Sequence, residues 1–419
     1  MTGLATDDDT PAHRYWRRRI LITTIIGYAL YYFVRKNLSV AMPVMESQLG
    51  VSKSDLGLFL TLHGLLYGVS KFANGVIGDR VNARWFMAAG LAICAVINIA
   101  FGLASSVVAF GVLWMANGWF QGIGFPPCAR LMTHWFPPHR LATMMSVWNS
   151  SHSLGAGAVV ILCGYLAPID WRLCFFVPAG IALLGAGALA IFLRDTPESL
   201  GLAPVQGTLV TTADASEPVL SVLRSMVLSN PSIWLLAIAN FFVYAVRYGI
   251  LDWGPTFLKQ ARGVELTSAG WMIAAFEAAG ILGMLSSGWI TDRFFAGRGA
   301  RACLVYMTCC TAALAAFWLL PDSSTTVCTA LLVIAGFFIY GPQCLVGICV
   351  ANLATKRAAA SAVGLTGLFG YLSTVLSGVG IGWLVERHGW DAGFAMFFNC
   401  GVVGALLFAL CWRAKAHGY

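Results

Sequence analysis

Long apolar runs recur along the whole chain and limit what it can fold into. Twelve runs of about 20 residues are each long enough for one membrane-spanning helix. Only 11% of the 419 residues are charged, whereas a soluble domain averages about 25%. The sequence therefore predicts an all-α membrane protein with twelve transmembrane helices. The runs are residues 20–43, 57–78, 85–105, 108–130, 141–167, 172–193, 232–258, 266–290, 302–320, 325–350, 358–385 and 391–412.

Positive charges are distributed unevenly between the two sides of these spans. If the N-terminus is cytoplasmic, seventeen Lys and Arg residues fall in inner loops and ends and five in outer loops. Cytoplasmic loops carry such an excess, so we expect both termini in the cytoplasm. The same asymmetry explains the net charge of +8 without nucleic acid. No small-residue cleavage site follows the first run, so we expect no cleaved signal peptide.

The two halves of the chain repeat each other. The stretch GVIGDRVNAR at 75–84 recurs as GWITDRFFAGRGAR at 288–301, and GWFQGIGFPPC at 118–128 recurs as GFFIYGPQCL at 336–345. Offsets of 213 to 219 in the same order indicate that six spans were duplicated in one orientation. We therefore expect two pseudo-symmetric six-helix bundles, residues 1–195 and 231–419, joined by a polar cytoplasmic linker at 196–230.

Two matched bundles that rock around a midplane site give the alternating access of secondary transporters. Each half carries an Asp-Arg pair, Asp79-Arg80 and Asp292-Arg293, at the cytoplasmic end of its second span. We expect these pairs to latch an inner gate; the alternative is that they only fix topology and loop shape. The twelve cysteines show no metal-ligand spacing, so we interpret them as packing residues and predict no metal site.

Seven ionisable side chains lie deep in the spans, where a charge usually faces a water-filled cavity and serves a function. Four permanent cations against two acids leave a formal excess of +2 before the histidine is counted, so the cavity should bind an anion. These residues are Arg35, Lys36, Lys71, His152, Arg247, Asp252 and Glu277.

Arg35 and Arg247 occupy corresponding places, 212 residues apart, in the first span of each half. Because a guanidinium matches phosphate or carboxylate oxygens two at a time, both could hold one anion. Lys36 lies about 100° further round the helix and should act differently. It either exchanges salt bridges with Asp252 or Glu277 during gating or forms a permanent structural ion pair.

Polar side chains share helix faces with these cations. Histidine and a phosphate ester both titrate near neutrality, so His152 could sense the ligand's charge; the alternative is a buried neutral imidazole. The spacings that place donors beside charged groups are Tyr28 and Tyr32 before Arg35, Tyr67 before Lys71, Asn149 before His152, and Tyr244 before Arg247.

Several short signatures together resemble the organophosphate:phosphate antiporters of the major facilitator superfamily. They are YYFVRKN, YGVSKF, GIGFPPC, WNSSHSLGAG, VRYGILDWGPTFLK and GLTGLFGYL, in order between residues 14 and 412. The resemblance implies the major facilitator fold and exchange of a phosphate ester for inorganic phosphate, without a cofactor. It implies that Arg35, Arg247, His152 and Lys71 bind the phosphate, that Lys36, Asp252 and Glu277 exchange charges, and that the pore is lined by Tyr28, Tyr32, Tyr67, Tyr244, Asn149, Phe125, Tyr340 and Tyr371.

Two departures from the family pattern leave the ester open. Phe125 stands where glycerol-3-phosphate carriers have Trp, and Val363 and Thr366 stand where one hexose-phosphate carrier group has Asp and Lys. The N-terminal half looks closest to a hexose-phosphate branch that contains both a transporter and a sensor. Hexose 6-phosphate is therefore slightly favoured over glycerol 3-phosphate.

The sequence also bears on three other functions: a sensor, a membrane phosphatase and an anion channel. A sensor would bind the same ester without efficient transport, although the chain shows no added signalling domain. A membrane phosphatase would need a nucleophile with a base or paired metal carboxylates, and the deep acids have cations to neutralise. An anion channel would not need duplicated rocking halves. Family membership further implies a bacterial inner membrane, small-molecule ligands without nucleic acid, and a functional monomer.

Overall fold

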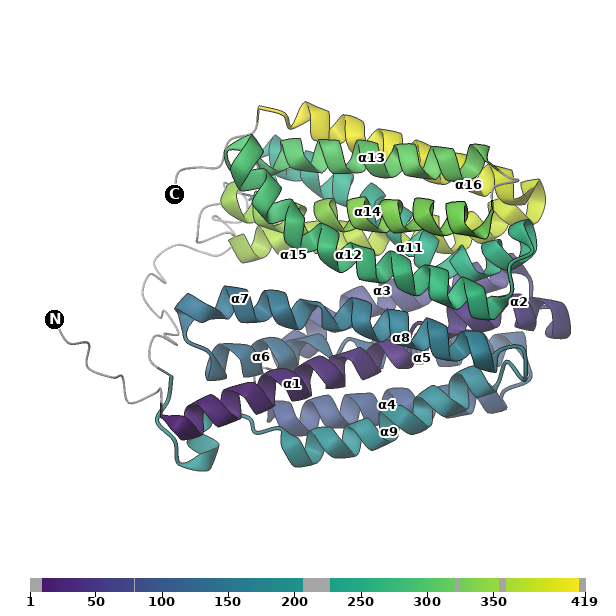
Figure 1. Cartoon of the computed structure of the whole chain (residues 1–419). Coiled ribbons are helices and arrows are strands. Elements are labelled where there is room, and N and C mark those ends of the chain that lie inside the picture. Colours follow the sequence, from purple (N-terminus) through teal and green to yellow (C-terminus); the bar gives the residue numbers. More distant parts are fainter. Residues whose placement is uncertain (1–9, 79, 206–226, 321–323, 354–358, 414–419) are drawn as a thin grey trace. The chain divides into compact units, whose positions relative to one another are not determined.

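The computed structural model describes residues 10–78, 80–205, 227–320, 324–353 and 359–413, and these residues form helices without any strand (Figure 1). The all-α prediction is therefore confirmed for this part of the chain. Asp79 and most of the predicted linker lie outside the described residues. The elements are α1 (Pro11–Phe33), α2 (Asn37–Leu49), α3 (Lys53–Gly78), α4 (Ala83–Leu103), α5 (Val107–Gln121), α6 (Phe125–Trp135), α7 (Pro138–Asn149), α8 (Ser151–Leu166), α9 (Leu173–Phe192), η1 (Pro197–Leu200), α11 (Pro231–Arg262), α12 (Leu266–Phe295), α13 (Gly299–Leu319), α14 (Thr325–Leu353), α15 (Ala359–Leu372), η3 (Val375–Gly380) and α16 (Ile381–Leu410).

Each predicted apolar run falls on one helix or on consecutive ones, and the described part of run 358–385 covers α15, η3 and the start of α16. Within the described residues, nine helical stretches are long and apolar enough to cross a membrane. The difference from twelve has local causes: α1 stops before α2, α7 stops before α8, and the last two runs merge into one stretch. Gly389, with a φ of 78°, interrupts that merged stretch between the two predicted spans. The number twelve thus stays a prediction, and the chain is a multi-pass membrane protein.

Contacts between elements divide the chain into two compact units. In unit 1, α4 packs against α9 and α5, and α1 packs against α6 and α9 (Figure 1). In unit 2, α14 packs against α12 and α13, and α11 packs against α15 and α16 (Figure 1). Unit 1 comprises Met1–Asn37, Leu66–Val159 and Arg172–Asp214, and unit 2 comprises Leu38–Leu65, Val160–Trp171 and Ala215–Tyr419.

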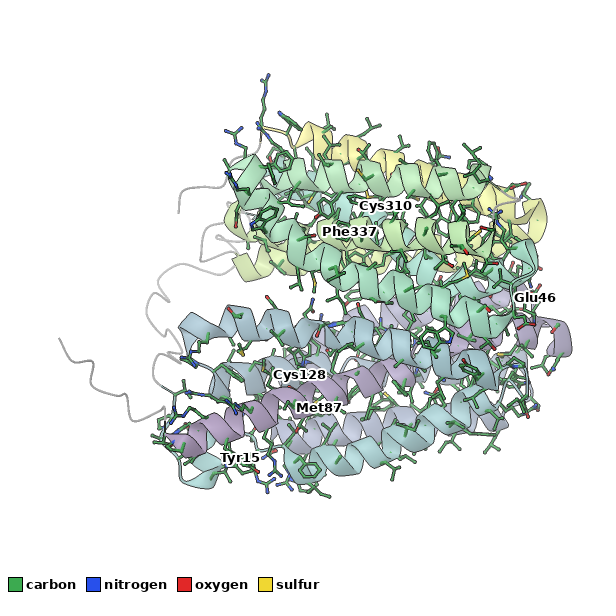
Figure 2. All side chains as sticks on the ribbon, viewed as in Figure 1. Tyr15, Glu46, Met87, Cys128, Cys310 and Phe337 are labelled. Atoms are coloured by element: carbon green, nitrogen blue, oxygen red, sulfur yellow. The ribbon has the colours of Figure 1, made fainter. Side chains whose placement is uncertain are left out.

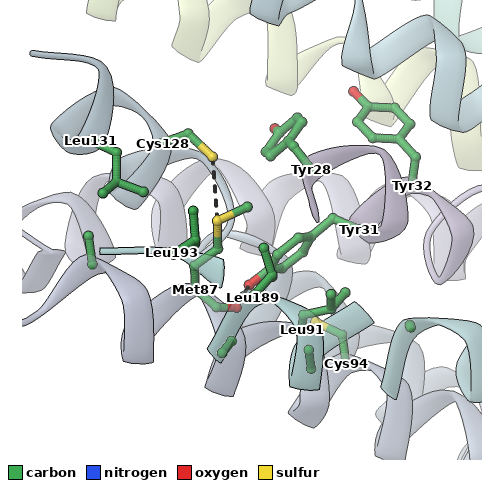
Figure 3. Close-up of a cluster of buried hydrophobic side chains, with 14 of the residues drawn as sticks. Tyr28, Tyr31, Tyr32, Met87, Leu91, Cys94, Cys128, Leu131, Leu189 and Leu193 are labelled. Atoms are coloured by element: carbon green, nitrogen blue, oxygen red, sulfur yellow. Dashed lines mark hydrogen bonds between the residues drawn. The ribbon is translucent and has the colours of Figure 1, made fainter. Parts of the chain in front are cut away.

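The buried core of unit 1 includes three tyrosines of α1. Tyr31 points into a buried cluster, where its hydroxyl donates to the Met87 carbonyl at 2.8 Å. Cys128 contacts the Met87 sulfur at 3.7 Å in the same cluster (Figures 2 and 3). Tyr28 and Tyr32 belong to the same cluster, and the centre of the Tyr28 ring lies 6.1 Å from that of Tyr31 (Figure 3). All twelve cysteines are free and nine are buried, which agrees with a packing role.

Unit 2 includes segments from the first half of the chain because small residues let helices approach closely. A Cβ on Gly57 of α3 would lie 2.5 Å from the Gly378 carbonyl oxygen. A Cβ on Gly270 of α12 would lie 2.6 Å from the Val160 carbonyl oxygen of α8. Neither approach tolerates a side chain. These close contacts explain why residues 38–65 and 160–171 pack with the second half, whereas the two six-helix bundles stay a prediction from the repeat.

Candidate anion-binding site

The first predicted span is not one continuous helix, and its two cations lie at the break. Helix α1 ends at Phe33 and α2 begins at Asn37. The backbone N–H groups of Arg35 and Lys36 both donate to the Tyr32 carbonyl, at 3.2 and 2.9 Å. The regular helical ladder is therefore lost at this point, and nearby carbonyls must find other donors because water is scarce at such depth.

Side-chain amides from two other helices supply those donors. The Val34 carbonyl accepts from Asn98 Nδ2 at 3.0 Å, Asn117 Nδ2 at 2.8 Å and Gln121 Nε2 at 3.4 Å. Gln121 Nε2 also donates to the Tyr31 carbonyl at 3.0 Å. Asn98 belongs to α4, whereas Asn117 and Gln121 belong to α5. The break is thus held by specific donors, which makes it a fixed feature of unit 1.

Asn37, the first residue of α2, completes this group of amides. Its Nδ2 donates to Asn98 Oδ1 at 2.8 Å and to the Cys174 carbonyl at 2.9 Å. We call Asn37, Asn98, Asn117 and Gln121 the amide cluster; all four are buried. Sequence reasoning missed it, although each member is a polar residue inside an apolar run, which is the signal that could have found it.

The side chains that follow the break lie among aromatic rings. The Arg35 guanidinium carbon lies 4.1 Å from the centre of the Tyr67 ring and 5.5 Å from that of Tyr32. Both Arg35 and Lys36 are buried. A cation over an aromatic ring is stabilised by the ring's negative face, so these rings stabilise the buried Arg35 guanidinium.

Histidine and tyrosines extend this aromatic surrounding. The Tyr28 hydroxyl lies 3.3 Å from the Tyr67 hydroxyl, and the Tyr28 ring lies 4.8 Å from the His152 ring. His152 Nδ1 lies 2.7 Å from the Asn149 carbonyl oxygen, which fixes the ring. Unit 1 therefore brings together Tyr28, Tyr32, Arg35, Tyr67 and His152, whereas their role in binding phosphate stays a prediction.

Lys71 lies on α3, one turn after Tyr67. Its Nζ is 3.9 Å from the centre of the Phe125 ring. Phe125 also contacts Trp148 edge to face, with ring centres 5.6 Å apart. The residue that departs from the glycerol-3-phosphate carrier pattern therefore still offers an aromatic face to a cation.

Arg247 of unit 2 has a different surrounding. It lies within α11, which runs unbroken for 32 residues, and only 3% of its surface is exposed. Its Nη2 donates to the Tyr340 hydroxyl at 2.9 Å, and that hydroxyl donates to Glu277 Oε2 at 2.5 Å. Glu277 Oε1 is also buried and has no hydrogen-bond partner within the described residues. Tyr340 is thus more than a lining residue, because it links a buried cation to a buried carboxylate.

Two further predicted residues, Tyr244 and Asp252, lie on α11 with Arg247. The Tyr244 ring contacts those of Tyr248 and Tyr371, with ring centres 5.3 and 6.4 Å apart. Asp252 is buried in α11, five residues after Arg247. Lys36 belongs to unit 1 and the two acids to unit 2, so their exchange of charges stays a prediction.

Of the predicted gate loops, Arg80, Asp292 and Arg293 are exposed, the latter two in the last turn of α12. The structure adds an acid that the sequence did not single out: Asp195 accepts from the Ala83 N–H at 2.8 Å and pairs with Arg130 at 3.2 Å. The Asp195 carboxylate therefore caps the N-terminal end of α4, directly after the loop that contains Arg80.

A second polar group lies at the start of α3, within unit 2. Ser54 donates its hydroxyl and its backbone N–H, the latter at 2.9 Å, to Glu386 Oε2. Thr61 Oγ1 donates to the Thr374 carbonyl at 2.8 Å and accepts from the Val379 N–H at 2.9 Å. These contacts tie residues 38–65 to η3 and α16, and sequence reasoning did not predict them.

The end of α2 adds further contacts at this place. Glu46, labelled in Figure 2, accepts from Lys53 and from Gln260 Nε2, the latter at 2.7 Å. Trp390 Nε1 donates to Gln260 Oε1 at 3.3 Å. The end of α2 and the start of α3, on either side of the turn between them, are therefore both hydrogen-bonded to the second half of the chain.

Several known proteins are similar to this chain over most of its length. The family model described as Major Facilitator Superfamily matches residues 24–378. Among curated proteins, the chain is 38% identical to the glycerol-3-phosphate transporter of Bacillus subtilis, covering 96% of this chain and 94% of that one. It is 38% identical to the probable hexose phosphate transport protein of Chlamydia pneumoniae, covering 96% and 92%. It is 37% identical to the membrane sensor protein UhpC of Salmonella typhimurium, covering 96% and 93%.

A solved structure has the same fold. The bacterial homologue of the human lysosomal transporter Spinster, in an inward-facing and unoccupied conformation, aligns with a TM-score of 0.81 and 18% sequence identity. The alignment covers 95% of this chain and 97% of that chain.

Proposed function

The chain belongs to the Major Facilitator Superfamily, and on this premise we propose that it transports a phosphate ester in exchange for inorganic phosphate. The observation that carries the proposal is the pair of buried arginines at equivalent places of the repeat, each lying over tyrosine rings. Relatives above 35% identity along most of their length include a glycerol-3-phosphate transporter and a hexose phosphate transport protein.

In this mechanism Arg35 and Arg247 both bind the phosphate group, since each guanidinium offers a planar fork of donors to its oxygens. His152 and Lys71 assist, and the tyrosines line the path. Without an anion, two arginines directed at one site repel each other and leave donors unmet. The empty carrier therefore reorients poorly, and this coupling gives exchange instead of net flow.

The buried carboxylates balance the remaining cations. Glu277 Oε1 can accept a further hydrogen bond, and Lys36 is the donor that we propose for it, with Asp252 as the alternative acceptor. Exchange of this bond during reorientation would make Lys36 a gate residue, whereas a bond present in every state would make it structural.

We further propose that the protein works as a monomer in a bacterial inner membrane, with both termini in the cytoplasm, and that it is a transporter and not an enzyme. The charge asymmetry of the loops supports this orientation. Hexose 6-phosphate and glycerol 3-phosphate are the two candidate esters, and relatives of both kinds match the chain equally well.

The test uses purified full-length protein in liposomes preloaded with inorganic phosphate. We expect efflux of labelled phosphate when glucose 6-phosphate or glycerol 3-phosphate is added outside, and little efflux without an external substrate. The faster of the two esters identifies the substrate class. Saturable binding of an ester without exchange would replace this proposal with a sensor, the role named for one relative.

A further inference from the structure

Three arginines of unit 1 donate to the C-terminal end of α9: one belongs to α1, one to α4, and one follows α9. Arg19 Nε donates to the Phe192 carbonyl at 3.1 Å, and Arg194 Nη1 donates to the Ile191 carbonyl at 2.9 Å. Arg84 Nε donates to the Ala190 carbonyl. All three carbonyls belong to the last turn of α9, which has no further backbone donors of its own.

This end carries more positive charge than the capping of one helix requires. Burial lowers the pKa of Arg194 below its ordinary value, and the positive charges of Arg84 and Arg19 lower that pKa further. The three guanidinium groups therefore act on one another electrostatically. Asp195, the next residue, is already engaged by Arg130 at 3.2 Å.

A hollow of about 740 Å³ lies beside this cluster, lined by Arg14, Arg18 and Arg19 together with apolar and aromatic groups. Figure 2 labels Tyr15 at this end of α1. The side chains of Arg14 and Arg18 are exposed and make no hydrogen bond to the protein within the described residues. The remaining lining residues are Pro11, Tyr15, Ile22 and Phe192.

The composition of the hollow fits a molecule that is anionic at one end and apolar at the other. Ile22 and Phe192 are 57% and 45% exposed on helices that enter the membrane. Trp16 and Trp85 lie under Arg19 and Arg84, at 4.8 and 4.6 Å. Tryptophan and tyrosine gather at the level of lipid headgroups, and basic clusters there attract anionic lipids.

We propose that this hollow binds the headgroup of an anionic phospholipid. The arginines of α1 contact the lipid phosphate, and Ile22 and Phe192 contact its first acyl carbons. This site is separate from the one formed by Arg35, so it does not depend on the proposed transport function.

The repeat offers a matched control. Arg301 of unit 2 corresponds to Arg84 at an offset of 217. Its Nε donates to the Trp412 carbonyl at 3.2 Å, and it lies 4.6 Å over the Trp412 ring. The position corresponding to Arg19, at the offset of 212 that relates Arg35 to Arg247, is Pro231. Arg301 therefore bonds a carbonyl just beyond the end of α16 without a counterpart of Arg19.

The experiment is native mass spectrometry of the full chain, released from nanodiscs of phosphatidylcholine containing a minor share of phosphatidylglycerol. We expect retention of phosphatidylglycerol in preference to phosphatidylcholine. In the double variant Arg14→Gln/Arg18→Gln, apparent affinity should fall by about 25-fold, since each arginine near a charged membrane surface contributes about fivefold. That variant leaves the bonds to α9 in place, and Arg301→Gln should bind like the wild type.

Equal retention of the two lipids, or unchanged binding by the double variant, would overturn the proposal. Loss of the bound lipid on addition of inorganic phosphate alone would also overturn it, in favour of a soluble phosphate at the same arginines. Phosphate exchange by the wild type in liposomes, measured separately, decides the transport function whatever the lipid result.

Discussion

Arg35 and Arg247 hold corresponding places in the sequence repeat, but the protein holds them in different ways. Arg35 follows a break between α1 and α2 whose carbonyls are satisfied by the amide cluster. Arg247 lies inside a continuous helix and is bonded to Tyr340, which in turn is bonded to Glu277. The backbone beside Arg35 is held by the amide cluster and its guanidinium lies over the Tyr67 and Tyr32 rings, whereas the Arg247 guanidinium donates to a hydroxyl.

The difference has a consequence for motion. The chain passes from unit 1 to unit 2 between Asn37 and Leu38, directly after the break. Arg247, Tyr340 and Glu277 all lie inside unit 2. A bend directly after the break would therefore change the direction of α2, while Arg35 would stay with Tyr32 and Tyr67 inside unit 1. We infer that the chain bends at this junction during reorientation.

The largest expected effect comes from replacing either arginine with lysine. Arg35→Lys and Arg247→Lys keep the charge but lose the planar fork, so each should lower the rate of phosphate exchange by about a hundredfold. The measurement is labelled-phosphate efflux from liposomes. Exchange at the full rate in either variant would contradict the role of that arginine.

The second prediction concerns the break between α1 and α2. Asn117→Leu removes the closest donor to the Val34 carbonyl, so the backbone that carries Arg35 should loosen. The Val34 carbonyl keeps Asn98 and Gln121 as donors, so the variant loses one hydrogen bond, worth up to about 1.5 kcal/mol. We expect KM for phosphate to rise by up to about tenfold. KM and the melting temperature should both be measured.

Asn240→Leu is the matched control for this variant. Asn240 is also buried and donates Nδ2 to the Thr366 carbonyl at 2.8 Å, but α11 has no break there. Both variants should lower the melting temperature, while only Asn117→Leu should raise KM. An equal rise in KM in both would mean that the amide cluster only stabilises the fold.

A smaller effect is expected where Arg247 is positioned. Tyr340→Phe removes the hydroxyl that joins Arg247 to Glu277 but keeps the ring, 4.5 Å from the guanidinium carbon. Because the cation–π contact remains, exchange should slow only about fivefold. Tyr306→Phe, which loses a hydroxyl 3.0 Å from Ser286, is the control.

Combining the two changes sharpens the comparison. If the two arginines are positioned independently, the effects of Asn117→Leu and Tyr340→Phe on exchange should multiply. A double variant no worse than Asn117→Leu alone would show that the amide cluster and Tyr340 support the same step.

The pair of arginines could be predicted from sequence because a repeat and a helical spacing are both visible in one dimension. The register of Tyr28, Tyr32 and Arg35 belongs to the same kind of information. The break at Arg35 could not, since Val34 is an ordinary helix residue by propensity. Its carbonyl accepts hydrogen bonds from side chains far along the chain, of which Asn98 and Asn117 lie 64 and 83 residues away.

The link from Arg247 to Glu277 escaped prediction for a related reason. Charge counting assigned Glu277 to a cation, but it could not show that Tyr340 stands between that carboxylate and Arg247. The Ser54 contact with Glu386 joins residues 332 positions apart and carries no periodic signal. Periodicity and charge locate groups on helices, whereas tertiary packing decides which polar atoms meet.

The smallest expected effect tests whether the break transmits motion. Glu386 accepts from the Ser54 backbone N–H and hydroxyl in the first turn of α3, where a helix favours negative charge by about 0.3–1 kcal/mol. Glu386→Gln should weaken this contact at the end that the charge asymmetry places outside. Conformers open at that end should become about twofold more populated, so half-saturation by external ester should fall about twofold.

The control for this variant is Glu265→Gln, since Glu265 precedes α12 without a capping hydrogen bond from its side chain. The hairpin that Glu386 holds includes α2, the helix that follows Arg35. The effect of Glu386→Gln should therefore depend on whether Asn117→Leu is present but not on Tyr340→Phe. Equal dependence on both would mean that the break does not connect this end of the molecule to Arg35 in particular.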